Sequence, residues 1–151
     1  MAKHLKLPLL TLCLFIASFM VFYSTTFSNA ADPKVNVEIT SAFISAPPAG
    51  AKTAAAFLTL TSKTEDRLLR ASSLRASKVE LHNMTMEDGV MQMRPLDKGI
   101  DLPADQPVIL SPEGMHVMFI GITEPFKPGE RIPVTFEFKN APTQTINISV
   151  R

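Results

Sequence analysis

The chain has 151 residues, of which 46% are hydrophobic and 19% are charged, and its formal net charge is +1. This length accommodates one compact domain with an appended segment and is too short for a two-domain enzyme with a large cofactor cleft. A charge this close to zero argues against a nucleic-acid-binding protein, because neutralising phosphates requires a basic surface.

The first thirty residues have the features of a targeting segment. A basic start (Lys3-His4-Leu5-Lys6) is followed by an uncharged stretch over 7–30, which ends in the small-residue pattern Ser28-Asn29-Ala30. This combination predicts a cleavable secretory signal peptide over 1–30 and a mature domain over 31–151. The protein is therefore expected to be exported, with no stable membrane span once the leader is removed.

An uncleaved anchor is the alternative, since the apolar stretch is nearly as long as the roughly 20 residues that a span needs. The cleavage pattern and the lack of basic residues after the stretch favour removal. Cys13 has no small residues directly before it, which argues against lipid attachment there. Without the leader the chain keeps two histidines, His82 and His116, no cysteine, and six methionines that all lie between Met84 and Met118.

The mature chain is predicted to be all-β, with about seven or eight strands and no segment of helical period. Asp88-Gly89 is a strong hairpin signal, and a polar loop is expected over 95–106. The turn spacing is typical of a sandwich or barrel, and a domain of this size can fold without a metal staple. The segments predicted to be strands are 35–39, 53–61, 79–82, 91–94, 108–110 (short and buried), 115–120, 131–138 and 143–150, and 66–72 contains a short apolar run.

The histidines and methionines have spacings that bring them together on strands. His116 and Met118 are two residues apart, so they face the same side. A two-residue turn at Asp88-Gly89 would place Met84 opposite Met93, whereas a longer loop would shift this register. With the shorter turn, one face would carry His82, Met84, Met86, Met91 and Met93.

This donor set favours a soft monovalent ion. Uncharged thioether sulfur suits Cu(I), which accepts mixed sulfur and nitrogen ligands. Zinc sites use cysteine, histidine or carboxylate, and a blue-copper site needs a cysteine thiolate, which the mature chain lacks. We therefore expect a site that holds Cu(I) rather than one that cycles electrons.

Structural roles compete with metal binding for some of these residues. Buried methionines commonly fill gaps in a core. Core or loop packing is the expected role of Met115, Met86 and Met91, and for Met84 the two roles are balanced. The metal site is expected to comprise four residues, with Met84 as an accessory ligand: His82, Met93, His116 and Met118.

Three segments together resemble the PCu(A)C family of periplasmic copper chaperones: 79–84 (VELHNM), 89–94 (GVMQMR) and 110–118 (LSPEGMHVM). The family signature is a histidine, ten residues, a methionine, a spacer of just over twenty residues and then His-x-Met. Ten residues separate His82 from Met93, and twenty-two separate Met93 from His116.

The resemblance implies a cupredoxin-like, Greek-key β-sandwich that binds Cu(I) near one end. It also implies a periplasmic role in delivering copper to the copper-bearing subunit of cytochrome c oxidase, together with thioredoxin-like copper assembly proteins. By position the implied ligands are His82, Met93, His116 and Met118. Two departures concern other residues: Pro112-Glu113-Gly114 stands where many members have Pro-Gly-Gly, and Phe43 stands where a tryptophan is common.

Three other functions compete with this one. A copper-storage or copper-tolerance protein would use the same ligands. A hydrolase or oxidoreductase would need a histidine base with a polar partner, and the chain has no nucleophile elbow, phosphate loop or dinucleotide fingerprint. A metal-independent interaction module would use the methionines only as a sticky surface. The sequence thus predicts a non-enzymatic copper carrier.

Overall fold

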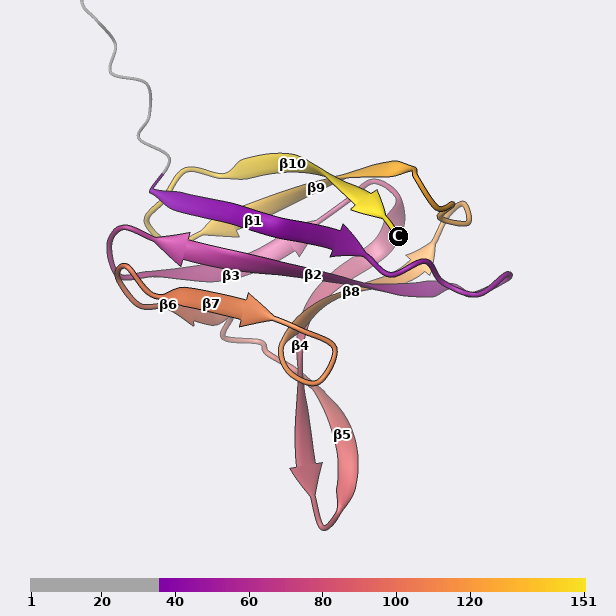
Figure 1. Ribbon diagram of the computed structural model, residues 1–151, viewed down its shortest axis with the longest axis horizontal. Helices are drawn as coiled ribbons and strands as arrows, with labels where there is room; N and C mark the ends of the chain where they lie inside the picture. Colours follow the sequence, from indigo (N-terminus) through magenta and orange to yellow (C-terminus); the bar gives the residue numbers. More distant parts are fainter. Residues whose placement is uncertain (1–35) are drawn as a thin grey trace, which may run out of the picture. The chain divides into compact units, whose positions relative to one another are not determined.

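The computed structural model describes residues 36–151, and the predicted signal peptide over 1–30 lies outside these residues. Between 36 and 151 there is no helix, so the all-β prediction is confirmed. Accordingly, this part of the chain contains no helix with the length and apolarity to span a membrane. Ten strands are formed (Figure 1): β1 (Val37–Ile44), β2 (Thr53–Ser62), β3 (Asp66–Ser72), β4 (Ala76–Glu87), β5 (Val90–Pro95), β6 (Ile100–Leu102), β7 (Pro107–Leu110), β8 (His116–Ile122), β9 (Arg131–Phe138) and β10 (Gln144–Val150).

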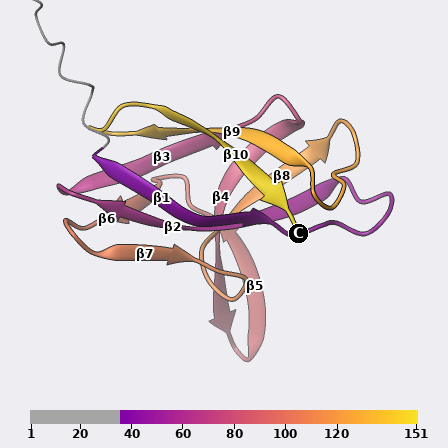
Figure 2. The same cartoon turned by 45° about the horizontal axis from the view of Figure 1, so that its top comes forward.

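The strands form one continuous path that curls around a single core. Their order is β5-β4-β8-β2-β1-β10-β9-β3-β6, with β7 paired to β2. The parallel β1–β10 pair brings the first and last strands together. Along β2, residues 53–56 pair with β8 and residues 58–61 pair with β7. In both cartoon views β9 and β10 lie on one side of the body and β6 and β7 on the other (Figures 1 and 2).

The core is built by strands whose side chains alternate between buried and exposed. In β9 the apolar members of the alternation, from Ile132 to Phe138, are buried and their neighbours face outward. Phe119 of β8 is fully buried and meets Phe126 edge to face, with ring centroids 5.5 Å apart. β8 itself is two-sided, because Val117 and Phe119 enter the core while His116 and Met118 face the other way.

Two sequence predictions about strands are wrong. The predicted polar loop over 95–106 contains β6, whose Ile100 and Leu102 are buried against the core. β6 pairs with β3 and has only three residues, so its alternation of apolar and polar residues is too short to be recognised in the sequence. The strand over 108–110 is not wholly buried, because β7 pairs with β2 and leaves Ile109 63% exposed.

The β4–β5 hairpin projects away from the body in both views (Figures 1 and 2). Asp88 and Gly89 form its two-residue turn, with φ values of 51° and 79°. Positive φ at both central residues gives the turn a twist that matches paired strands, and Asp-Gly is a favoured sequence for it. β4 is consequently longer than the predicted 79–82 segment and carries its outer half into solvent.

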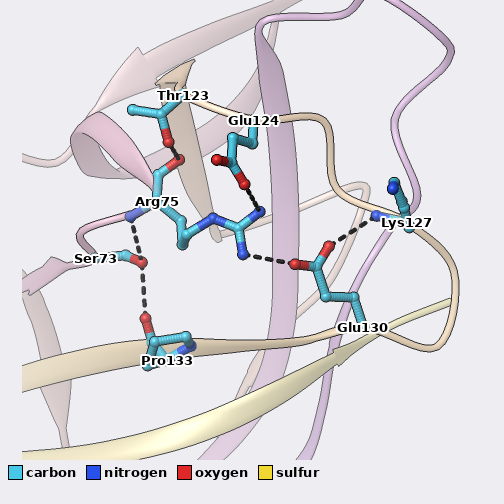
Figure 3. A network of polar contacts seen from close by, with 7 residues as sticks. All are labelled: Ser73, Arg75, Thr123, Glu124, Lys127, Glu130 and Pro133. Atoms are coloured by element: carbon cyan, nitrogen blue, oxygen red, sulfur yellow. Dashed lines mark hydrogen bonds and ion pairs between the residues drawn. The ribbon is translucent and has the colours of Figure 1, made fainter.

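A polar network holds the β3–β4 connection to the segment between β8 and β9 (Figure 3). Arg75 Nη1 donates to Glu130 Oε1 at 2.6 Å, and the guanidinium lies over the Phe126 ring at 5.4 Å. Thr123 Oγ1 donates to the Arg75 carbonyl at 3.2 Å. Ser73 Oγ accepts from the Arg75 amide and donates to a carbonyl of β9. The network ties two connections and strand β9 together without involving any histidine or methionine.

Candidate metal site

Two imidazoles from separate strands meet in the structure. β4 and β8 are antiparallel neighbours, and His82 lies directly opposite His116. The ring centroids are 5.8 Å apart with an interplanar angle of 70°. Both side chains are buried. Two imidazoles bound to one ion through bonds of about 2 Å would have ring centres roughly 6 Å apart, so this separation fits a shared metal ion.

Methionines surround the histidine pair on the same face. Met118 is two residues beyond His116, and the hairpin register places Met84 opposite Met93, as predicted from the two-residue turn. A pocket of about 420 Å³ is lined by His116 and three of these methionines: Met84, Met93 and Met118. Met93 is 46% exposed. The pocket thus brings thioethers from three strands beside an imidazole, and one of them, Met93, is accessible to solvent.

The tautomer of His116 is set by a backbone carbonyl. Its Nδ1 lies 3.1 Å from the Gly114 oxygen, which only accepts hydrogen bonds, so Nδ1 carries the proton. The lone pair is then on Nε2. A backbone carbonyl on the far nitrogen is a common way to orient a metal-binding histidine.

His82 is held by a carboxylate. Its Nε2 donates to Glu80 Oε2 at 2.9 Å, and Nδ1 is buried without a hydrogen-bond partner. The pKa of Glu80 is lowered, first by the hydrogen bond from Lys78 and then by the one from His82. Because a buried polar atom without a partner is costly, the orphaned Nδ1 lone pair is the strongest sign in the site that a ligand belongs there.

One loop carbonyl contacts both strands that carry the histidines. The Gly114 oxygen, between β7 and β8, accepts the His116 ring proton and also the Met84 amide at 3.2 Å. Pro112, from the same loop, lines the pocket. The departure from Pro-Gly-Gly therefore falls in the segment that fixes His116 relative to β4.

Aromatic residues support the histidine pair from β2 and β1. The Phe57 ring lies 6.3 Å from the His116 ring, and Phe43 lies 5.3 Å from Phe57. Phe57 and Glu80 were not singled out from the sequence. Glu80 could have been found, since it is two residues before His82 and shares its face. No sequence signal marks Phe57, because its strand pairs with β8 only through the tertiary fold.

The remaining methionines differ in their environment. Met115 packs against the core, as predicted. Met86 and Met91 are 63% and 44% exposed, so the expectation of core or loop packing is wrong for them. Their hairpin extends beyond the body, where no second layer covers it.

A metal bound at this place by three or more side chains would need sulfur among its ligands. Within residues 36–151, nowhere do three or more histidine, cysteine or carboxylate side chains gather as a metal-binding group. The donors present at the histidine pair are instead two imidazoles and neighbouring thioethers. This set matches soft Cu(I) and is a poor match for zinc or for a hard cation.

Fold and site together define a class: an all-β sandwich that presents imidazoles and thioethers on the outer face of β4 and β8. The sequence over residues 37–150 matches the family described as "Putative lipoprotein LpqE-like", and the chain belongs to that family. A relative, "Putative lipoprotein Lxx21020" from Leifsonia xyli subsp. xyli (strain CTCB07), is 27% identical over 115 residues, which are 76% of this chain and 69% of the relative.

Solved structures share the fold. The copper-bound PCuAC domain from PmoF2 superposes with a TM-score of 0.63 at 23% identity, covering 77% of this chain and 92% of that domain. Apo-DR1885 from Deinococcus radiodurans has a TM-score of 0.60 at 27% identity, covering 78% and 79%. The Cu(I) form of DR1885 gives 0.57 at 27% identity, covering 73% and 74%. These likenesses confirm the predicted cupredoxin-like β-sandwich.

Proposed function

We propose that this protein is an exported chaperone that binds one Cu(I) through His82, Met93, His116 and Met118, with Met84 as an accessory ligand. The single observation that carries the proposal is the buried, unpartnered Nδ1 of His82, whose ring centre lies 5.8 Å from that of His116. Each ring has its other nitrogen engaged by a protein acceptor, so both lone pairs are available to one ion.

The choice of copper rests on donor chemistry and on relatives. Neutral thioethers select a soft cation and hold it less tightly than thiolates would, which suits an ion that must be passed on. Related folds include a domain described as copper-bound and a Cu(I) form of DR1885. In this proposal copper is the cargo, because a core of this extent supports a fold that does not depend on a bound metal.

Delivery and location complete the proposal. The copper-bearing subunit of cytochrome c oxidase is the proposed recipient, in concert with thioredoxin-like assembly proteins, and the proposed compartment is the periplasm. We propose that the leader over 1–30 is removed, leaving residues 31–151 as the copper-binding domain. The family description and the name of the Leifsonia relative both contain the word lipoprotein, which accords with export. The sequence around Cys13 still predicts no lipid attachment at that residue.

Anaerobic Cu(I) titration of the exported protein tests the site. We expect one ion per chain, with X-ray absorption showing both nitrogen and sulfur neighbours. His116→Ala should lose this binding, because it removes an imidazole and leaves the His82 lone pair without its counterpart. Met115→Leu is the matched control, since Met115 adjoins His116 but packs against the core. Unchanged stoichiometry in His116→Ala would contradict the proposal.

Transfer distinguishes a delivery chaperone from a storage protein. The Cu(I)-loaded chain is mixed with the copper-free, soluble copper-bearing domain of the oxidase, and copper is followed on both proteins. We expect copper to move to the oxidase domain faster than a small chelator of equal affinity removes it. Equal rates with both acceptors would favour storage and contradict delivery.

A further inference from the structure

The projecting β4–β5 hairpin has one face made of methionines. The register pairs Met84 with Met93 and Met86 with Met91. The Leu96 amide donates to the Leu81 carbonyl at 2.7 Å, so this is a hydrogen-bonded position of the ladder. Because hydrogen-bonded and non-hydrogen-bonded pairs alternate, both methionine pairs fall on non-hydrogen-bonded positions, where facing side chains come closest.

On the opposite face of the hairpin, polar side chains form hydrogen bonds with one another. Arg94 Nη2 donates to Glu87 Oε2 at 2.6 Å and to Gln92 Oε1 at 2.9 Å. Glu87 and Arg94 hold each other, and the pKa of Glu87 is lowered by this hydrogen bond. The hairpin is therefore two-sided, although it has no core to cover.

Burial does not explain the outer methionine pair. Met86 is 63% and Met91 is 44% exposed, so neither fills a gap in the protein. The inner pair, Met84 and Met93, lines the pocket beside His116. Each outer methionine lies two residues from an inner one on its own strand, a step of about 7 Å along the ladder. The two pairs thus form a row that leads from solvent to the histidines.

We propose that Met86 and Met91 form an outer Cu(I) site, which is the first position taken by an incoming ion and the last occupied by a departing one. The inference rests on the proposed function of the inner site. Two neutral thioethers bind a soft ion weakly, so the ion passes on to the site where imidazoles add to the donor set. The ion keeps its charge throughout, and no electron is transferred.

Methionine methyl signals report each pair separately. The exported protein, labelled with ¹³C at the methionine methyl groups, is titrated anaerobically with Cu(I) and, in parallel, with the redox-stable Ag(I) ion. Individual Met→Leu variants assign the signals. We expect the first equivalent to shift Met93 and Met118, and further ion to shift Met86 and Met91.

The outcomes separate this inference from the proposed function. If Met93 and Met118 respond while Met86 and Met91 stay unmoved in excess ion, the outer site is wrong and the inner site stands. If Met86 and Met91 respond alone, these two methionines bind the ion, but the inner site and the proposed passage of the ion to it are wrong. If none of these methyl signals shifts, both the outer site and the inner site are wrong.

Loading kinetics test the proposed order of binding. The double variant Met86→Leu/Met91→Leu keeps the shape and apolarity of the face but removes its sulfur. We expect it to bind one Cu(I) with the parent's affinity and to take that ion from a weak chelator severalfold more slowly. Val90→Leu, at the tip of the same hairpin, is the matched control and should load at the parent's rate. Equal loading by the double variant and the parent would overturn the inference.

Discussion

At the scale of single residues, the site depends on hydrogen bonds that fix which ring nitrogen is free. His82 and His116 would be ordinary buried side chains if both nitrogens of each ring were engaged. Instead, Glu80 engages Nε2 of His82, and the Gly114 carbonyl engages Nδ1 of His116. The two partners leave one lone pair on each ring, as the proposed role of both histidines as ligands requires.

Replacing Glu80 tests this positioning role. Glu80→Leu removes the acceptor, so the His82 ring is free to change tautomer and rotate. We expect Cu(I) affinity to fall by about 10–100-fold, the usual effect of losing such an outer partner, while one ion still binds. Glu80→Gln keeps an acceptor oxygen and should recover most of the affinity. Competition with a Cu(I) chelator measures these differences.

Lys78 supplies the control for that experiment. Its ammonium pairs with the other oxygen of Glu80, away from His82. Lys78→Gln should therefore leave Cu(I) affinity near the parent value. Parent-like affinity in Glu80→Leu, or an equal loss in Lys78→Gln, would contradict the positioning role of Glu80.

At the scale of elements, the hairpin turn decides which side chains share a face. A slip of one residue in the β4–β5 register would move Met84 and Met93 to opposite faces. Asp88 and Gly89 prevent this by forming a turn that needs positive φ at both positions. The turn thus fixes the register that keeps both methionine pairs on the same face of the hairpin as His82.

Gly89→Ala should loosen the hairpin. Its φ is +79° and nothing lies within 4 Å of an added Cβ, so the cost is conformational. We expect a loss of about 1 kcal/mol in the free energy of unfolding, with faster amide exchange at the hairpin tip. Gly129→Ala, at φ +84° and equally open, should cost a similar amount without changing hairpin exchange. Identical hairpin exchange in the two variants would contradict this view of the turn.

Much of this arrangement follows from the sequence because it is local. The Asp88-Gly89 signal and strand alternation were enough to predict that Met84 faces Met93, and the i, i+2 spacing was enough for His116 and Met118. The meeting of His82 with His116 is different. It depends on the antiparallel pairing of β4 with β8, which strand alternation does not predict. The two histidines were placed in one site from their donor chemistry and from the family resemblance.

What the sequence did not reveal depends on tertiary pairing. β6 is recognisable only because Ile100 and Leu102 are buried beside β3. Phe57 reaches His116 because β2 pairs with β8, and that contact joins residues far apart in the chain. Likewise, alternation alone does not show that Met86 and Met91 face solvent, because it identifies a shared face but not what covers that face.

At the scale of the whole molecule, the candidate metal site and the polar network are built by different parts of the fold. The site uses the outer face of β4 and β8, whereas the network joins the β3–β4 connection to the β8–β9 segment. β8 leads from one to the other, and its inward residues Val117 and Phe119 are fully buried. Stability can therefore be perturbed at the network while the proposed copper ligands stay unchanged.

Glu130 makes this separation testable by pH. The hydrogen bond from Arg75, and next that from the Lys127 amide, hold the pKa of Glu130 below its ordinary value near 4.5. A carboxyl with a lowered pKa in the folded state contributes stability that is fully present above its unfolded pKa and is lost as pH falls through the folded pKa. Glu130→Gln should thus be less stable than the parent at neutral pH, with a gap that narrows below about pH 5.

Denaturant unfolding of both proteins across this pH range measures the gap, and Cu(I) stoichiometry at neutral pH should be the same in both. Glu124→Gln is the control, because Glu124 lies 3.8 Å from Arg75 and its side chain is 80% exposed. An exposed pair of this kind contributes little, so this variant should follow the parent at every pH. A gap for Glu130→Gln that stays constant into acid would show that the Arg75 pair acts through its shape rather than through the charge of the carboxylate.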